Sequence, residues 1–387
     1  MRDAVIVKAL RTPIGKMGKS LATVSAIDLG THVIKAIIEQ SGVDPKEIDE
    51  VIFGNLLNFD YGNIARVSVL NADLPFSIPA LTVDRQCSSS LNAIALGAMM
   101  ISTGNVDVVL AGGTESYSQN PIMLKRPERA YSDAVVISGL KTSVEKVGNP
   151  TMIQTAENLA KMYKIDRKEC DEFAYRSHHL ASEAWNKGYF ADQVVNYEVK
   201  GKKGAATLVD MDDSVRSDCS MDSLAKLKPV YEGGIVTAGN SSPQNDAASA
   251  VLIMTREKAK ELGLEILAKV TGFASAGVDP NIMGIGPVYS TRKLLQKHGL
   301  KLEDIDLIEL NEAFAAQSIP CIRELGIDID RLNVNGGAIA IGHPLAASGG
   351  ILVARLVHEM KRRDAKRGLV TFCCGGGQGF SVLFERD

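Results

Sequence analysis

The chain has 387 residues, of which 45% are hydrophobic and 23% are charged, and its formal net charge is −3 at pH 7. This composition is typical of a globular protein of roughly two or three domains, and it offers no basic surface for nucleic acid or a membrane. No apolar run reaches the ~20 residues of a transmembrane helix, and the N-terminus does not resemble a signal peptide, so we expect a cytoplasmic protein. The six cysteines form no CxxC pair, which argues against a metal site and fits reduced thiols.

An amphipathic helix is predicted in the segment 27–54, followed by a glycine, an Ile-Asp pair and an apolar strand. The segment 290–311 repeats this order at a constant offset, and VVLAGG at 108–113 is echoed more loosely by LVTFCCGG at 369–376. Strands that read as continuous apolar runs are buried on both faces. We therefore expect two similar α/β halves, in which helices cover parallel or mixed sheets.

Residues 119–245 are more polar and loop-like than the sequence on either side. One helix is predicted there, beginning after Asp166 and ending at Gly188, and at least one of the adjacent residues His178 and His179 should face solvent. We predict an N-terminal half formed by 1–118 and 246–268, an inserted loop domain at 119–245, and a C-terminal half at 269–387.

Two stretches superficially resemble nucleotide-binding motifs. GKMGKS at 15–20 ends like a phosphate-binding loop, but the required first glycine is replaced by Pro13. GGGQGF fails the dinucleotide fingerprint because its last residue is Phe380. Neither stretch predicts a nucleotide site.

Cys87 lies between a strand-like run and a helix predicted to begin near Ser88 to Ser90 and to end near Gly104. A thiol at the first turn of a helix lies near unpaired N–H groups, and the helix dipole favours the thiolate. Nucleophiles often occupy such sharp strand-to-helix turns. The alternative interpretation is a buried structural cysteine.

Two further motifs carry groups suited to acyl chemistry. His343 lies in the glycine-rich stretch 335–350, between a glycine and a proline that restrict the backbone. Asn311 and Glu312 follow an apolar strand and could simply cap the next helix. Together with Cys87, these groups suit carbonyl chemistry through a covalent acyl-cysteine.

The stretch FCCGGGQG at 372–379 holds two adjacent thiols. Strand alternation sends Cys373 and Cys374 to opposite faces, so at most one of them can enter a given site. The residues alone leave open which thiol that is.

Taken together and in order, these motifs resemble those of a thiolase along essentially the whole chain. The matching stretches are RTPIGK at 11–16, Cys87 before its helix, AGGTES at 111–116, TAEN at 155–158, VTAGNSS at 236–242, NEAFA at 311–315, GGAIAIGHP at 336–344 and C-x-GGG-x-G at 373–379. The resemblance implies the α/β thiolase fold: two similar βαβαβαββ halves in a five-layered α-β-α-β-α core, with a loop domain inserted in the first half.

The resemblance also implies roles for individual residues. Cys87 would carry the acyl group, and His343 would take its proton and then, with a water held by Asn311, donate to the thioester oxygen. Cys373 would move the proton at the substrate α-carbon, while the N–H groups of Cys87 and Gly375 would form an oxyanion hole. The remaining implied residues are Cys374, as a packing residue, and the substrate and coenzyme A contacts Ser242, Met152, Arg216, Ala313 and Phe314, of which Met152 belongs to the acyl pocket.

The implied activity is acyl transfer between coenzyme A thioesters, either joining two acetyl-CoA or cleaving longer 3-ketoacyl-CoA. The acyl-CoA molecules are substrates, no metal or other cofactor is expected, and the implied assembly is a homodimer or homotetramer without nucleic acid or membrane partners. A ketoacyl synthase-like condensing enzyme and a non-catalytic acyl-CoA binding protein are the alternatives.

The sequence departs from the family pattern around the site. Ser-Ser-Ser follows the nucleophile where Gly-Ser-Gly is usual, so Ser88 and Ser90 add atoms beside it. Ala346 and Pro243 replace usual glycines, and Thr151 stands where short-chain biosynthetic thiolases carry a histidine. These departures leave the preferred acyl-chain length open.

Overall fold

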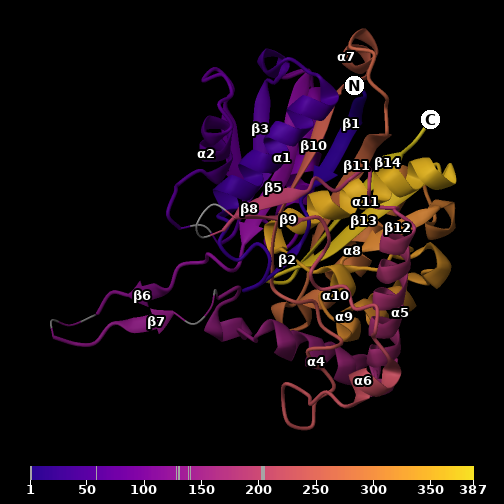
Figure 1. Cartoon of the computed structure of the whole chain (residues 1–387). Coiled ribbons are helices and arrows are strands. Elements are labelled where there is room, and N and C mark those ends of the chain that lie inside the picture. Colours follow the sequence, from indigo (N-terminus) through magenta and orange to yellow (C-terminus); the bar gives the residue numbers. More distant parts are fainter. Residues whose placement is uncertain are drawn as a thin grey trace.

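The computed structural model describes residues 2–57, 59–127, 129, 131–137, 139, 141–201 and 205–387. Most strands join one sheet in the order β12-β13-β14-β11-β1-β10-β5-β3-β4, and β2 pairs with β10 beside this path (Figure 1). Their bounds are β1 (Ala4–Arg11), β2 (Gly15–Lys16), β3 (Glu50–Gly54), β4 (Ala80–Val83), β5 (Val108–Ser116), β10 (Asn245–Thr255), β11 (Ala268–Gly277), β12 (Leu307–Leu310), β13 (Arg367–Cys374) and β14 (Gln378–Glu385).

Eleven α-helices are described, joined by short 3-10 turns. The helices are α1 (Ala26–Ser41), α2 (Ile64–Asn71), α3 (Ser89–Ser102), α4 (Met152–Tyr163), α5 (Arg167–Asn186), α6 (Met221–Ala225), α7 (Arg256–Glu261), α8 (Gly286–His298), α9 (Ala315–Leu325), α10 (Ala338–Ile341) and α11 (Ser348–Arg363). The 3-10 turns are η1 (Pro45–Glu47), η2 (Glu145–Val147), η4 (Pro280–Ile285), η5 (Leu302–Asp304), η6 (Ile329–Arg331) and η7 (Leu345–Ala347). Among the described residues, no helix is both long enough and apolar enough to cross a membrane.

The sheet consists of two halves with the same strand order. The first half runs β4-β3-β5-β10-β1 and the second runs β12-β13-β14-β11, with an isolated bridge between Ile308 and Leu332 in the place that β4 occupies in the first. In both halves, the strand that follows the central helix (α3 or α11) pairs in parallel with its neighbour: β5 pairs with β3, and β13 pairs with β12. The halves join through β1 and β11, which pair in antiparallel fashion. The internal repeat predicted from the sequence is confirmed.

The repeated Ile-Asp pairs make the same contacts in both halves. Asp49 Oδ2 accepts N–H bonds of 2.7 and 2.9 Å from the residues that lead into β5, and Asp306 Oδ2 accepts two bonds of 2.8 Å at the start of β13. The preceding helices both end at a left-handed glycine, Gly42 with φ 70° and Gly299 with φ 65°. Each acidic residue therefore holds the start of the neighbouring parallel strand, which explains why the pattern recurs.

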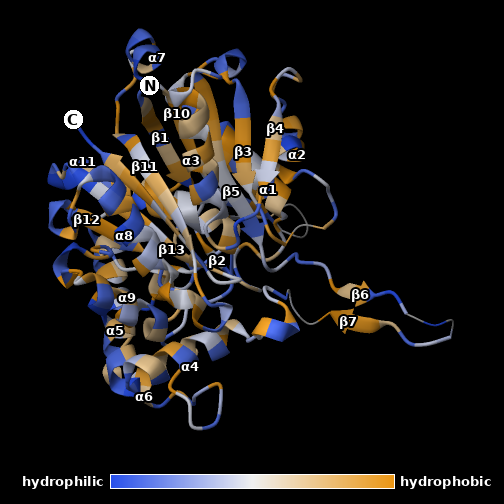
Figure 2. Cartoon of the chain, turned by 180° about the vertical axis from the view of Figure 1, so that it is seen from behind, coloured by the Kyte–Doolittle hydropathy of each residue, from blue (hydrophilic) through white to orange (hydrophobic). Residues whose placement is uncertain are grey.

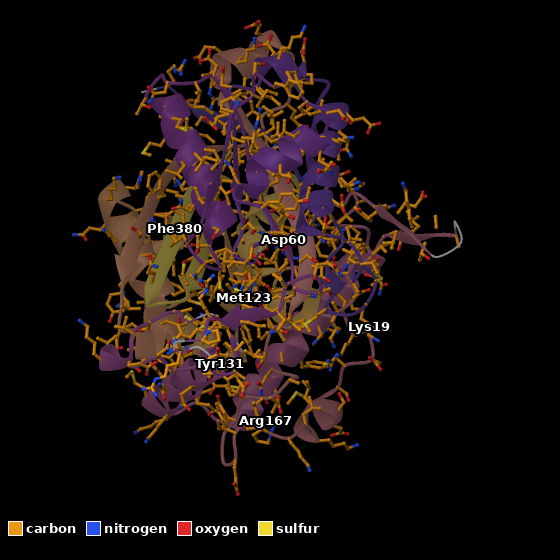
Figure 3. All side chains as sticks on the ribbon, turned by 90° about the vertical axis from the view of Figure 1, so that its left-hand side faces the viewer. Lys19, Asp60, Met123, Tyr131, Arg167 and Phe380 are labelled. Atoms are coloured by element: carbon orange, nitrogen blue, oxygen red, sulfur yellow. The ribbon has the colours of Figure 1, made fainter. Side chains whose placement is uncertain are left out.

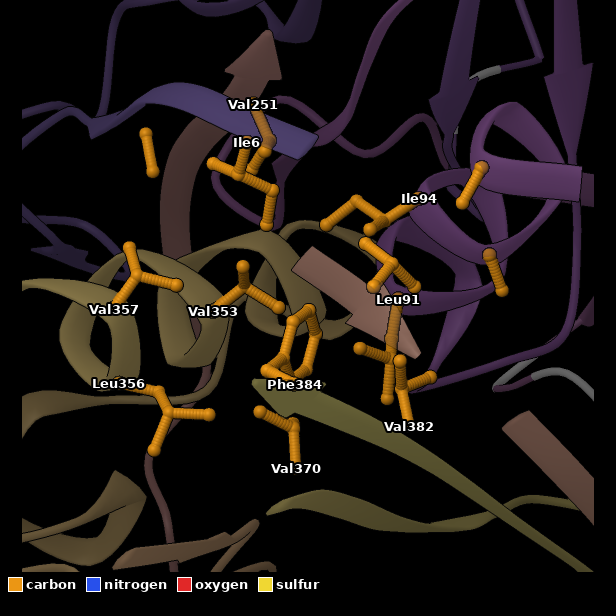
Figure 4. Packing of buried hydrophobic residues seen from close by; sticks show 14 of the residues in the cluster. Ile6, Leu91, Ile94, Val251, Val353, Leu356, Val357, Val370, Val382 and Phe384 are labelled. Atoms are coloured by element: carbon orange, nitrogen blue, oxygen red, sulfur yellow. The ribbon is translucent and has the colours of Figure 1, made fainter. Parts of the chain in front are cut away.

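Helices α3 and α11 lie between the strands of the two halves and contact each other. Helices α1 and α2 cover the outer face of the first half, and α8 and α9 pack on the second. Figure 4 shows the core between the two halves of the sheet, where Leu91 and Ile94 of α3 meet Val353 of α11 and Val382 and Phe384 of β14. Figure 2 shows hydrophobic residues concentrated in the strands, while the outer helices also carry hydrophilic faces. A helix that is apolar almost all round, such as α3, is expected in such a central layer.

The segment predicted as an inserted loop domain contains two small hairpins as well as α4, α5 and α6. The hairpin strands are β6 (Met123–Lys125), β7 (Val135–Ile137), β8 (Tyr197–Lys200) and β9 (Ala206–Val209). The β6–β7 hairpin extends away from the body and points toward the viewer in Figure 3, where Met123 and Tyr131 are labelled. Helices α4 and α5 pack on α9 of the second half. The division of the chain into domains at residues 118, 245 and 268 stays a prediction.

A buried ion pair ties this segment to the first strand. The Arg11 guanidinium donates to both carboxylate oxygens of Asp212, at 2.7 and 3.0 Å, and neither side chain is exposed to solvent. Arg11 also donates to Gln193, and its guanidinium lies over the rings of Trp185 and Phe190. The hydrogen bonds and the aromatic rings together replace the water that both charges lose on burial.

We expect Asp212→Ala to lower the free energy of unfolding by about 3–5 kcal/mol, because it leaves the Arg11 charge buried without its partner. The matched control is Glu172→Ala, which removes an exposed ion pair with Lys168 on α5 and should cost about 1 kcal/mol at most. Urea unfolding of both variants measures the difference. Equal costs would show that the buried pair does not anchor the segment.

Candidate active site

Cys87 lies in the turn between β4 and α3 and is partly exposed. The turn is sharp: Gln86 adopts a left-handed conformation with φ 50°, and Ser89 Oγ accepts from the N–H of Arg85 at 2.8 Å. Ser89 Oγ also donates to the carbonyl of Gln86 at 2.6 Å. The strand-to-helix turn predicted from the sequence is thus present, and side-chain hydrogen bonds close it.

The environment of the Cys87 sulfur favours the protonated thiol. Burial is the largest influence and raises the pKa of Cys87 to about 12, while N–H groups of Gly375 and of Cys87 itself hydrogen-bond to the sulfur and lower the pKa. These N–H groups act in the direction that the sequence predicted, toward the thiolate, but burial outweighs them in the unliganded protein. Both N–H groups predicted for the oxyanion hole lie against this sulfur.

His343 is held by three hydrogen bonds. Its backbone N–H donates to Asn245 Oδ1 at 2.9 Å, its Nδ1 lies 2.6 Å from Ser348 Oγ, and its Nε2 lies 3.4 Å from Asn311 Nδ2. Burial lowers the pKa of His343 to about 4, so the imidazole is neutral at pH 7. When Nδ1 donates its proton to Ser348, Nε2 keeps a lone pair that can accept another.

Asn311 and Glu312 do not cap α9, whose N-cap residue is Phe314. Asn311 contacts the His343 ring, and its buried Oδ1 has no hydrogen-bond partner among the described residues. Glu312 accepts hydrogen bonds from the Ser177 hydroxyl at 2.7 Å and from the N–H of Ile339 at 3.2 Å, just before His343. Both side chains therefore make contacts with distant segments near His343 rather than cap a helix.

The two adjacent thiols of β13 face different surroundings, as strand alternation predicts. Cys373 packs with Met283 and Ala313, beside Met152 and Phe314, so it lies among three of the residues predicted to contact the substrate or coenzyme A. Burial raises its pKa well above the usual value of a thiol, and neighbouring thiols, first among them that of the proposed nucleophile, raise it further.

Cys374 instead faces the core between the two halves of the sheet. Its sulfur donates to Ser88 Oγ at 3.0 Å and thereby links β13 to the residue after Cys87. The burial of Cys374 in this core confirms the prediction that it is a packing residue.

A cavity of about 450 Å³ is lined by Arg216, Ser242 and Gln244, among others. Ser242 donates from both its N–H and its hydroxyl to the Ala313 carbonyl at 3.0 Å, and Gln244 forms a backbone bridge with His343. The wall of this cavity is thus continuous with the segments that carry the imidazole and the Cys373 cluster.

Sequence reasoning missed two buried groups. His178 lines the cavity and accepts from the N–H of Arg216 at 3.3 Å, whereas His179 is exposed. Glu115 accepts N–H bonds from Leu57 at 3.0 Å and from Ala346 at 3.4 Å, and burial raises its pKa to about 8. Their only sequence signals were a histidine pair and the AGGTES motif.

Within the described residues, no cluster of three or more His, Cys, Asp or Glu side chains could hold a metal.

We expect stability to fall between pH 6.5 and about 4, because burial lowers the pKa of both His178 and His343 to about 4 from 6.5. As pH falls below 6.5 the unfolded chain binds these protons first, so each histidine removes up to about 1.4 kcal/mol of unfolding free energy per pH unit. His178→Gln should reduce that slope, and the matched control His179→Gln should not. Urea unfolding from pH 7 to 4.5 measures both, and an unchanged slope in His178→Gln would contradict the assignment.

Comparisons with known proteins agree with this arrangement. The family model of the thiolase N-terminal domain matches residues 4–257, and that of the C-terminal domain matches 264–386. The chain is 46% identical to the acetyl-CoA acetyltransferase of Pseudomonas aeruginosa, with 100% of both chains covered. The solved acetyl-CoA acetyltransferase of Bacillus anthracis superposes with a TM-score of 0.96 at 40% identity, and human mitochondrial 3-ketoacyl-CoA thiolase with 0.95 at 41%; each alignment covers 100% of this chain and 99% of the other. The chain belongs to the thiolase family.

Proposed function

We propose that the protein is an acyltransferase that moves acyl groups between coenzyme A thioesters through a covalent acyl-cysteine at Cys87. The observation that carries this proposal is that both halves meet at Cys87: a Cβ at Gly375 would lie 3.1 Å from Gln86 Oε1, beside Cys87, and the N–H groups of Gly375 and Cys87 lower the pKa of the Cys87 thiol. A thioester oxygen that becomes negative at this point would find two donors already in place. Each such donor is worth about 3–4 kcal/mol in related acyl transfer.

His343 is the proposed base. Its neutral ring accepts the thiol proton of Cys87 as the sulfur attacks the 3-keto carbon of the substrate, and the bond between the keto carbon and the α-carbon then breaks. The acyl group stays on the sulfur of Cys87. Because the thiol is a far weaker acid than the imidazolium, the proton leaves as the carbon–sulfur bond forms rather than before it.

Cys373 is the proposed acid for the departing fragment. The electron pair of the broken bond remains on the α-carbon of acetyl-CoA, and the Cys373 thiol, which its raised pKa keeps protonated, donates a proton there. The thiol of free coenzyme A then gives its proton to the Cys373 thiolate and attacks the acyl-cysteine, and the Cys87 sulfur leaves with the proton that His343 returns to it, which releases the second thioester. Condensation runs through the same steps in reverse. The transferred group stays bonded to sulfur throughout, so we propose no other cofactor.

The cavity beside the site is the proposed coenzyme A channel. Arg216 and Lys16 line it and supply positive charge for phosphate groups, while Ser242 lies at its junction with Ala313. Met152 and Phe314, beside Cys373, are proposed to contact the acyl end. We also propose that the protein is cytoplasmic and has no nucleic acid or membrane partners. We propose a homodimer or homotetramer because the strands of the protruding β6–β7 hairpin carry exposed apolar side chains, which include Leu124, Val135, Val136 and Ile137.

The alternatives fit less well. A ketoacyl synthase-like enzyme needs no thiol at position 373, yet Cys373 lies among the residues proposed for the acyl end. A non-catalytic acyl-CoA binding protein would be favoured if the serines beside Cys87 crowded its sulfur. Instead, the Ser88 hydroxyl pairs with Cys374 and the Ser90 hydroxyl with Gly350. A catalytic Cys87 is therefore the better interpretation.

The protein should convert acetoacetyl-CoA and free coenzyme A into acetyl-CoA, which chromatography of the thioesters detects. A series of 3-ketoacyl-CoA substrates of increasing length then gives the preferred acyl-chain length. This length is open because Thr151, which pairs with Tyr231 at 2.7 Å, stands where a histidine is usual in short-chain enzymes. Cys87→Ser is the inactive control. Binding of coenzyme A without turnover of any 3-ketoacyl-CoA would reject the proposed activity.

Cys373→Ala should still form the acetyl-Cys87 intermediate from acetyl-CoA, yet lose carbon–carbon bond formation by roughly 10²–10⁴-fold, because only the α-carbon proton transfer is removed. Mass spectrometry of the intact protein detects the acylation, and acetoacetyl-CoA formation measures the condensation. Cys374→Ala is the matched control and should retain both. Loss of acylation in Cys373→Ala would contradict the division of roles.

A further inference from the structure

The first turn of α11 lacks a cap from its own segment. Its N-cap residue is Ala347, and no side chain there accepts a hydrogen bond. The first N–H groups of a helix have no acceptor within the helix, and when buried they need one from elsewhere. The N–H of Gly350 finds it on another helix, because it donates to Ser90 Oγ of α3 at 2.9 Å.

The contact between the two helix termini is close. Ser90 is fully buried, and a Cβ at Gly113 of β5 would lie 2.9 Å from the Ser90 Cβ. A Cβ at Gly349 would collide with the backbone of Leu91. The serine therefore lies between α3, α11 and β5 at a place where its neighbours Gly113 and Gly349 must lack a Cβ.

The same turn of α11 holds the imidazole. Ser348 is the first residue of α11, and its hydroxyl lies 2.6 Å from His343 Nδ1. A continuous path thus runs from Cys87 through the first turn of α3 to Ser90, across the hydrogen bond to α11, and through Ser348 to His343. Each link is a hydrogen bond or one helical turn.

We propose that Ser90 is a positioning residue that fixes the His343 ring relative to the Cys87 thiol, by supplying from α3 the acceptor that the first turn of α11 lacks. This inference rests on the acyl transfer proposed above. Ser90 touches neither the reacting atoms nor the cavity that Arg216 and Ser242 line. Its loss should therefore slow the chemical step and leave substrate binding unchanged.

Ser90→Ala is the test variant, measured with acetoacetyl-CoA and free coenzyme A. We expect kcat to fall by roughly tenfold or more, because a misplacement of catalytic groups by about 1 Å can cost up to about 10²-fold in rate, while KM stays within about twofold. Single-turnover acylation of Cys87 by acetyl-CoA should slow by the same factor. Ser102→Ala is the matched control on α3, since among the described residues the Ser102 hydroxyl bonds only to the Ala98 carbonyl of its own helix, and kcat should not change.

A double-mutant cycle separates positioning from general stability. In a Ser348→Ala background, Ser90→Ala should cost little further rate, because the path to His343 is already broken. Thermal unfolding of each variant checks that the protein is folded during the assay. If Ser90→Ala does not fold, Ser90→Cys, which keeps a weaker acceptor, takes its place in the cycle with the same expected non-additivity.

Losses that simply add, or a Ser90 variant with the kcat of the unmodified protein, would overturn the positioning role while leaving the proposed acyl transfer intact. Absence of turnover in the unmodified protein would overturn the proposed function, and the positioning role with it.

Discussion

The site depends on one packing contact, that between the N-terminal ends of two buried helices. Helices α3 and α11 meet so closely that Gly349 can carry no side chain, and a Cβ at Gly113 would strike the Ala346 carbonyl. Cys87 stands directly before α3, and His343 stands just before α11. The packing of the central layer therefore brings the proposed nucleophile and the proposed base together from distant parts of the chain. Interiors of this density have few alternative arrangements, so the geometry of the site is a property of the core.

The same burial determines which groups are charged. It raises the pKa of Cys87 to about 12 and lowers the pKa of His343 to about 4, so thiol and imidazole are both neutral in the unliganded protein. A neutral pair costs far less to bury than an ion pair would. Charge then develops only when a substrate is attacked, opposite N–H groups that are already oriented. Because the Cys87 thiol and the His343 imidazole are both neutral, the unliganded site can lie between the two halves without a buried charge that the protein would have to stabilise.

The fold and the proposed catalytic residues could be predicted from the sequence to a large extent. The repeat of helix, glycine and Ile-Asp identified two similar halves because each element has a local physical cause, a left-handed helix end or an acceptor for two N–H groups. Strand alternation separated Cys373 from Cys374 because the side-chain period of a strand is fixed. These features depend on residues near one another in the chain.

The features that sequence reasoning missed depend on distance in space. Asn311 and Glu312 follow a strand, which suggests caps; only the family resemblance linked Asn311 to His343, and nothing linked Glu312 to the Ser177 hydroxyl, far away in the sequence. The sequence indicated only the N–H groups that lower the pKa of Cys87, because the helix terminus is local; it did not indicate the burial that outweighs them. Likewise, nothing in the His178–His179 pair indicates which ring lines the cavity. Periodicity assigns a face to a residue but not the neighbour across it.

The three serines after Cys87 illustrate how a departure from a family pattern can be compatible with its chemistry. A hydroxyl buried without a partner costs about 1–3 kcal/mol, but each of these has one: Ser88 with Cys374, Ser89 within its own turn, and Ser90 with Gly350. Two of the three bonds cross to the second half. Serine also has fewer unfolded conformations than glycine, which lowers the entropy that folding removes. The added atoms therefore hold the turn against β13 and α11, and the sulfur keeps its access to N–H groups on both sides.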